Sequence, residues 1–317
     1  ASSTGASNTA VGSYALVANT TASNGTSIGF ESLKANTTGG NNTAVGHQSL
    51  LANTTGANNV AMGQAALAAN TTAADNTAIG YAALAANTGD QNVAVGSNAL
   101  DANTSGRNNI GIGKDSLGVN TTGDSNLSIG VAALDANTTG DNHVALGYGA
   151  LSANTTASDN TAVGYLAGVA LTTGDKTVCI GNNAGDTLTT GGNNIFIGYG
   201  ADGDASNNSS TIAIGYTLVG VGTNYVALGK GAGSDRIYCA YTTDSTWTRV
   251  SDERYKKDIA TNTDCGLDFI NDLNPVTFKW KAKSEIDSDL PDYDETEMNP
   301  EYEGKMYGLV AQEVKET

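Results

Sequence analysis

The sequence predicts an all-β parallel β-solenoid with coils of 17 residues, followed by a small α+β domain. Three observations support this prediction: a glycine returns at a fixed short period, apolar side chains alternate around that glycine, and both features stop near residue 234. A fixed period is typical of architectures in which similar units stack, each contacting only its neighbours. We therefore expect a repeat region at 1–234, a connector at 235–250 and a second domain at 251–317.

The repeat is marked by a glycine that closes a phrase of the NTAVG type. This glycine occurs fourteen times, and eleven of the thirteen intervals between its copies are 17 residues, the others being 16 and 14. Such constancy predicts one structural coil per interval. The repeat glycines are Gly12, Gly29, Gly46, Gly63, Gly80, Gly96, Gly113, Gly130, Gly147, Gly164, Gly181, Gly198, Gly215 and Gly229.

Each coil is expected to open with a short strand. The residue before the repeat glycine is Val, Ile, Met or Leu in every copy, and the residue three before it is Thr, Val, Ile or Leu. Mostly Ala or Ser lies between them, and an alternation of two is the period of a strand. The two larger side chains therefore share one face, while the small residue faces a close neighbour or solvent.

Two further columns describe the rest of the coil. A Leu follows the glycine by four residues in the first nine copies, and an Asn follows that Leu by three. Gly and Asn favour corners, where a positive φ is tolerated. We therefore expect each coil to run strand, corner, strand, corner, with identical residues aligned as ladders that include hydrogen-bonded Asn side chains.

Coils of this size enclose little, so an apolar strip should remain uncovered. The chain has only 4 Phe and 2 Trp, which suits a thin stack better than a wide core. Joining three chains around an axis would bury the strip. The packing therefore predicts a homotrimer.

Composition disfavours several classes of partner and cofactor. The net charge of −17 disfavours nucleic acid and anionic membranes as partners. The sequence contains no run of 18 apolar residues, so we expect no membrane insertion. The three cysteines have no metal-ligand spacing, and we expect no cofactor and no metal. His47 and His143 lie in different coils without carboxylates at ligand spacing, so we interpret both as surface variation.

The repeat of about 17 residues ends after Gly229. Residues 251–317 hold 17 acidic and 8 basic residues, whereas the first 250 residues hold only 15 and 7. In the C-terminal region, CGLDFINDL is expected to be a short helix. Val276, Phe278 and Trp280 alternate as in a strand, and MYGLV is also strand-like.

Two resemblances follow from these motifs. The NTAVG phrases resemble the head repeats of trimeric adhesins of the YadA type, which implies a left-handed parallel β-roll, although those repeats are usually shorter than 17 residues. The motifs SDERYKKDI, LDFINDLNPVTFKWK and YGLVAQEV, in this order, resemble the peptidase S74 intramolecular chaperone of phage tail spikes and fibres. Members of that family usually continue with further helices, so we expect residues 251–317 to be an incomplete copy.

The second resemblance implies self-cleavage of the Val250–Ser251 bond, with Ser251 as nucleophile and Lys256 as its base. A serine hydroxyl needs such a partner, and Ser–Lys pairs are a known variant. Arg254 could lower the pKa of the lysine, and Asp252 could orient or cap. The alternative is that Ser251 caps a helix and the charges are solvated.

The resemblances predict a structural and host-attachment fibre of a bacteriophage virion, located in the tail and trimerised by its own chaperone. Its partners would be two further copies, a host surface glycan or protein receptor, and other tail proteins. The alternative is a bacterial or prophage-encoded trimeric surface adhesin. A glycan-cleaving enzyme is disfavoured because the repeats show no paired carboxylates. A glycan-binding tip around Phe196, Tyr199 and Tyr216 is a further hypothesis.

Overall fold

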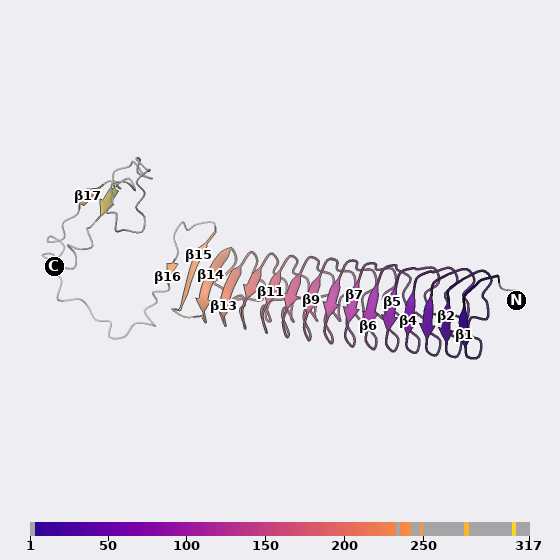
Figure 1. Ribbon diagram of the computed structural model, residues 1–317. Helices are drawn as coiled ribbons and strands as arrows, with labels where there is room; N and C mark the ends of the chain where they lie inside the picture. Colours follow the sequence, from indigo (N-terminus) through magenta and orange to yellow (C-terminus); the bar gives the residue numbers. More distant parts are fainter. Residues whose placement is uncertain (1–3, 233–234, 242–247, 250–275, 279–305, 309–317) are drawn as a thin grey trace, which may run out of the picture. The chain divides into compact units, whose positions relative to one another are not determined.

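The computed structural model describes residues 4–232, 235–241, 248–249, 276–278 and 306–308. The chain divides into two compact units, residues 1–251 and residues 252–317. The first unit is a stack of coils in which one strand per coil contributes to a single continuous sheet (Figure 1). This arrangement confirms the predicted parallel solenoid.

The strands of the stack pair in sequence order, from β1 to β16. Neighbours from β1 to β14 are parallel, and equivalent residues face one another, as Thr43 of β3 faces Val60 of β4. The bounds are β1 Thr9–Val11, β2 Thr26–Ile28, β3 Thr43–Val45, β4 Val60–Met62, β5 Thr77–Ile79, β6 Val93–Val95, β7 Ile110–Ile112, β8 Leu127–Ile129, β9 Val144–Leu146, β10 Thr161–Val163, β11 Val178–Ile180, β12 Ile195–Ile197, β13 Ile212–Tyr216, β14 Tyr225–Lys230, β15 Arg236–Ala240 and β16 Thr248–Arg249.

The interior of the coil is lined by small residues, Leu and Asn. From β2 to β14, the residue two before the repeat glycine faces inward and is buried, as Ala44 and Ala94 are, whereas Ala10 in β1 is exposed. The sequence left open whether the residue at this position faces a close neighbour or solvent. The structure shows that it faces a close neighbour. Leu117 and its equivalents fill the interior opposite the strand. The larger side chains on either side of the small residue point outward, where they are half-buried or exposed.

Two buried Asn ladders run along the stack, as predicted. In the first, Asn120 donates from Nδ2 to Oδ1 of Asn103 at 2.9 Å, and Asn137 donates in the same way to Asn120. In the second, Oδ1 of Asn109 accepts the backbone N–H of Asn126 at 2.9 Å. Because buried amides are costly unless they are bonded, the ladders satisfy most of the polar interior from neighbouring coils; Asn70 Oδ1 and the amide of Asn154 are exceptions.

The predicted second strand of each coil is wrong. The corresponding arc consists of turns. Its residues alternate into the left-handed region, for example Glu31 at φ 56° and Leu33 at φ 49°, which a β-strand does not allow. Hydrogen bonds between coils persist there, since Leu33 N donates to Ser49 O at 3.0 Å and Ala35 N to Leu51 O at 3.1 Å.

The repeat glycine is required by both conformation and space. Gly113 has φ 133°, and a Cβ built on it would lie 2.4 Å from the carbonyl oxygen of Gly130 in the next coil. The repeat glycines from Gly12 to Gly215 each face the next repeat glycine in this way, whereas Gly229 faces Asp235 and Arg236. A side chain at this position would therefore hold neighbouring coils apart.

The last described coils close the stack differently. β14 pairs antiparallel with β15, and β15 pairs antiparallel with β16. In the second unit, β17 (Val276–Phe278) pairs antiparallel with β18 (Met306–Gly308). These two strands confirm the strand predictions for VTF and MYG. The predicted helix CGLDFINDL and Trp280 lie outside the described residues, and the described parts of the chain contain no helix.

Candidate functional site

The residues predicted to carry self-cleavage lie outside the described residues. These are Val250, Ser251, Asp252, Arg254 and Lys256, and their roles stay predictions. The described segment that precedes them is β16, which ends at Arg249. The backbone that leads to the predicted scissile bond is therefore an extended strand paired with β15.

The closing hairpin is held to the stack by Arg236, the first residue of β15. Its Nη1 donates to the carbonyl oxygen of Val219 and to that of Gly220 at 3.4 Å. Its guanidinium carbon lies 5.8 Å from the centroid of the Tyr238 ring. A charge-assisted bond and a cation–π contact thus fix the strand on which β16 pairs.

The outward strand face carries many exposed apolar side chains. We define it as the residues three before, one before and one after each repeat glycine. β13 and β14 continue through the glycine to Tyr216 and Lys230, and strand alternation there places all three positions on one side. In the other coils the strand ends before the glycine, and the residue after it is exposed in each of them except at Ser97. Many of its large side chains are exposed, including Ile28, Met62 and Ile129. Contiguous exposed apolar surface of this kind marks an interaction site.

The residues directly after the repeat glycines form the post-glycine column, which is rich in aromatic side chains. Tyr148 and Tyr165 stack with ring centroids 5.4 Å apart, and Tyr199 and Tyr216 stack at the same distance. These four rings are about half exposed. The members are Ser13, Phe30, His47, Gln64, Tyr81, Ser97, Lys114, Val131, Tyr148, Tyr165, Asn182, Tyr199, Tyr216 and Lys230.

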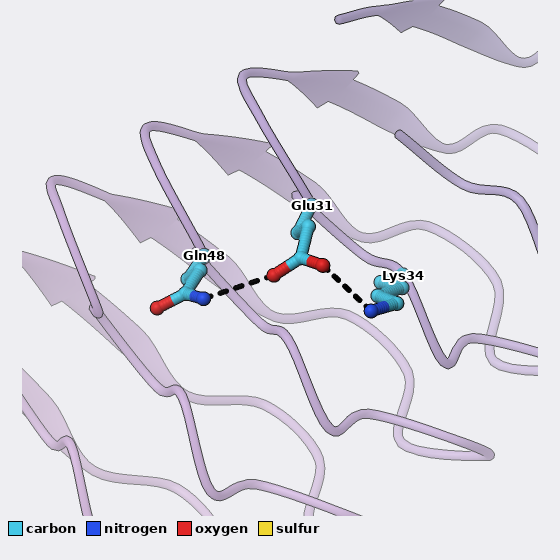
Figure 2. Close-up of polar contacts among 3 residues, drawn as sticks. All are labelled: Glu31, Lys34 and Gln48. Carbon is cyan, nitrogen blue, oxygen red and sulfur yellow. Dashed lines mark hydrogen bonds and ion pairs between the residues drawn. The ribbon is translucent and has the colours of Figure 1, made fainter. Parts of the chain in front are cut away.

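Beside this column, polar side chains link one coil to the next. Figure 2 shows Glu31 accepting hydrogen bonds from Lys34 Nζ at 2.6 Å and from Gln48 Nε2, one coil further on, at 2.9 Å. The bond from Lys34 and then that from Gln48 hold the pKa of the Glu31 carboxyl below its usual range. Both partners occupy the carboxylate, so this group is a structural link and not a free base.

The interpretation of His143 as surface variation is wrong. His143 is fully buried in the second Asn ladder, at a position where neighbouring coils carry Asn. Its Nε2 lies 2.6 Å from Ala157 O, and its Nδ1 accepts the backbone N–H of Asn160 at 3.2 Å. Both ring nitrogens are used in the neutral state, and burial lowers the pKa of this imidazole. His47 is exposed and stacks on Phe30 at 5.4 Å.

The hypothesis of a glycan tip around Phe196 needs a correction. Phe196 is fully buried, because it occupies the inward position in the middle of β12. Tyr199 and Tyr216 remain on the surface, as a stacked pair.

One pair of neighbouring carboxyls lies near this region but is closed to a substrate. Burial and the adjacent Asp186 raise the pKa of Asp202, whose carboxylate accepts N–H bonds from Thr187 and Gly203. Because Asp202 is only 6% exposed, the pair does not flank an open site as glycoside hydrolysis requires. Over the described residues, no three His, Cys, Asp or Glu side chains come together as metal ligands.

Comparison with known families identifies the C-terminal segment. Residues 251–317 match the Peptidase_S74 family, described as chaperone of endosialidase. This segment is a peptidase S74 domain. The match covers all three motifs that suggested the resemblance, together with Ser251, Asp252, Arg254 and Lys256; Val250 directly precedes it. No curated protein matches the chain.

The S74 domain implies a trimeric assembly and points to a protein of the phage tail fibre or tail spike type. The stack of 17-residue coils that precedes it is consistent with that type and with YadA-like repeats. In the part of the chain that the structure describes, no helix has the length and apolar character needed to span a membrane.

The post-glycine column was not predicted from the sequence, although two of its members, Tyr199 and Tyr216, were named as part of a possible glycan-binding tip. The signal was available: extending the strand alternation by one step, across the glycine, places this residue on the same face as the two aliphatic columns. Because the predicted strand ended at the repeat glycine, the aromatic side chains after it were not assigned to this face.

Proposed function

We propose that this chain is a structural and host-attachment fibre of a bacteriophage virion, trimerised by its S74 domain. The observation that carries the proposal is the combination of that domain with a long stack of nearly identical coils. Repetition supplies length and stiffness, whereas an aperiodic domain supplies alignment. Two further copies, a host glycan or protein receptor and other tail proteins are the proposed partners.

The outward strand face supports the trimer. Its residues before the glycine are aliphatic, Met or Thr in every coil, and many are exposed in the single chain. Burying apolar surface contributes about 25 cal/mol per Å², so packing three such faces around an axis would stabilise the assembly. The chain's net charge of −17 opposes association elsewhere.

The S74 domain would act before the fibre is complete. Contacts between chains are non-local, and repeated coils allow a displaced alignment at little cost. A domain that associates first would align three chains, after which the stack would form from that end. Cleavage at Val250–Ser251 would then remove the template and trap the fibre kinetically.

The proposed chemistry is one acyl transfer per chain. Ser251 Oγ attacks the carbonyl carbon of Val250 while Lys256 takes its proton. The C–N bond between Val250 and Ser251 then breaks, and Lys256 returns the proton to the freed α-amine of Ser251. Water hydrolyses the resulting ester to the carboxylate of Val250 and the hydroxyl of Ser251. For Lys256 to act as a base its pKa must fall from about 10.4, which burial or the charge of Arg254 would produce. A single turnover requires no fast catalyst.

The test is the intact mass of the expressed chain. The unchanged protein should yield fragments 1–250 and 251–317, whereas Ser251→Ala and Lys256→Met should remain full length. Ser251→Thr retains a hydroxyl nucleophile and should cleave slowly. Cleavage of Ser251→Ala at the same bond would disprove the assigned nucleophile, and an uncut wild-type chain would disprove self-processing while leaving the trimer to be tested by native mass.

The YadA-like repeats favour a second candidate, a bacterial or prophage-encoded surface adhesin. The two candidates differ in location. An antibody against the stack should label purified virions if the chain is a tail fibre, and the surface of uninfected cells if it is an adhesin.

A further inference from the structure

The regularity of the stack creates an alignment problem between chains. Along the outward strand face, the column directly before the glycine holds only Val, Ile, Met or Leu. The column three before it holds only Thr, Val, Ile or Leu. Two chains displaced by one coil, about 4.8 Å, would therefore meet almost the same side chains in these columns. The column before the glycine does not distinguish the correct alignment from a displaced one, and the column three before it does so only where Thr meets an aliphatic residue.

The post-glycine column belongs to the same face but does not repeat. Tyr216 lies in β13 and pairs with Lys230 of β14, so this column continues the surface of the two aliphatic columns. Its composition changes from coil to coil between aromatic, amide, aliphatic and basic side chains. It is therefore the part of the face in which each coil differs from its neighbours.

The order of the tyrosines makes a displacement costly. The stacked pairs Tyr148–Tyr165 and Tyr199–Tyr216 are separated by one coil, which carries Asn182. A displacement of one coil would bring Asn182 to the height of a tyrosine on the neighbouring chain. The amide would lose water without gaining a partner, and the ring would lose apolar contact.

The charge pattern favours copies of the same chain as the occupant of this face. None of its positions, three before, one before and one after each repeat glycine, carries Asp or Glu, although the chain holds 32 acidic residues. Chains of net charge −17 can approach most closely where no carboxylate lies between them.

We propose that the post-glycine column is a register key, which determines which coil of one chain packs beside which coil of the next. This inference rests on the proposed trimer. The S74 domain would set the alignment during assembly, and the column would preserve it after the domain has been cleaved away. The tyrosines would then be specificity residues of an interface between copies and not a platform for sugars.

Photo-cross-linking of the full chain tests the proposal, with p-benzoylphenylalanine placed at Ser97 in the column. The assembled protein is held just below its melting midpoint, so that coils can exchange partners, and is then irradiated. Peptide mapping of the cross-linked dimer identifies the coil of the neighbouring chain to which the probe at position 97 is attached. Wild-type products should be confined to the coil of Ser97.

Replacing Tyr148, Tyr165, Tyr199 and Tyr216 together by Ser should raise the products at other coil heights several-fold. The matched control replaces four exposed threonines of the turns by Ser and should behave as wild type; they are Thr55, Thr72, Thr122 and Thr139. If the four-tyrosine variant gave the same cross-linked products as the wild type, the proposal that this column is a register key would be overturned. A trimer without inter-chain products would also overturn it, because the rings would then be open to a ligand such as a sugar. A monomeric wild-type mass would instead refute the trimer of the proposed function.

Discussion

The first coils and the later coils of the stack fill the same interior in two different ways. From Leu33 to Asn154, each coil uses a buried Leu and, three residues on, a buried Asn. In the next two coils, Gly168 and Gly185 replace the Leu, while Leu171 and Leu188 replace the Asn.

The space left by these glycines is filled from the strand. A Cβ on Gly185 would lie 2.5 Å from Cys179 Sγ and 3.0 Å from Phe196, the two largest side chains in the strand-centre column. The later coils thus exchange a polar ladder for apolar packing without changing the pairing of their strands.

The comparison teaches that backbone stacking and interior chemistry are separable. Every coil keeps the repeat glycine and the strand register, whichever interior it uses. At the boundary the polar ladder ends: Asn154 has neither Oδ1 nor Nδ2 hydrogen-bonded, and Leu171, which takes its position in the next coil, offers no donor to Oδ1. An unsatisfied buried amide of this kind costs about 1–3 kcal/mol per group.

The largest effect should come from breaking what both regions share. Gly113→Ala places a Cβ against the backbone of Gly130 at a φ that L-residues avoid, so the neighbouring coils must separate. We expect a loss of at least about 3 kcal/mol or failure to fold, measured by urea denaturation followed by circular dichroism.

Gly118→Ala, five residues further on, is the matched control for this change. Its Cβ would lie 3.4 Å from its nearest neighbour, Asp115 O, so the urea midpoint should stay near that of the wild type. Equal loss in both variants would show that glycine content, and not the contact between coils, determines the stability.

The second prediction tests the difference between the two interiors. Asn120→Leu removes the donor to Asn103 Oδ1 and the acceptor for Asn137 Nδ2, and should destabilise the stack by about 1–3 kcal/mol for each group left unsatisfied. Asn154→Leu removes no side-chain hydrogen bond and extends the apolar column of Leu171, so it should be neutral or stabilising. Urea midpoints of the two variants that shift equally would contradict the boundary between the interiors.

Much of the stack could be predicted because its signals are local and repeated. The spacing of Gly113 from Gly96 and Gly130 determines the coil, and alternation around each glycine determines the strand. The buried Asn column was predicted because one amide supplies both a donor and an acceptor along an axis.

The errors arose where tertiary context overrode a local preference. Leu33 in a left-handed conformation is disfavoured in isolation, and only the bonds to the next coil maintain it, so a second strand was predicted in its place. The burial of Phe196 could not be seen because its space comes from a missing side chain at Gly185 in the preceding coil. The cleavage residues were identified from their motif alone, and their positions lie outside the described residues.

The smallest expected effect is a pH dependence confined to one rung. Burial lowers the pKa of His143 in the folded chain below its ordinary value of 6.5, against the smaller opposing effects of the Ala157 and Asn160 bonds and of nearby Asp159 and Asp141. The unfolded chain therefore binds the proton more readily. Stability should be complete above about pH 6.5 and should decrease as the pH falls from there towards the folded pKa, by about 1.4 kcal/mol per unit of difference between the two pKa values.

His143→Asn restores the residue of the neighbouring rungs and is the control. Protonation of Nδ1 in the wild type opposes the Asn160 N–H, whereas an Asn at this position would accept that N–H at every pH. The difference in urea midpoint between the two proteins should therefore grow as the pH is lowered from 7.5 to 5.5, while the carboxylates common to both cancel in the comparison. A difference that stays constant over this range would mean that the imidazole has the same pKa in the folded and the unfolded chain, and that its burial does not oppose protonation.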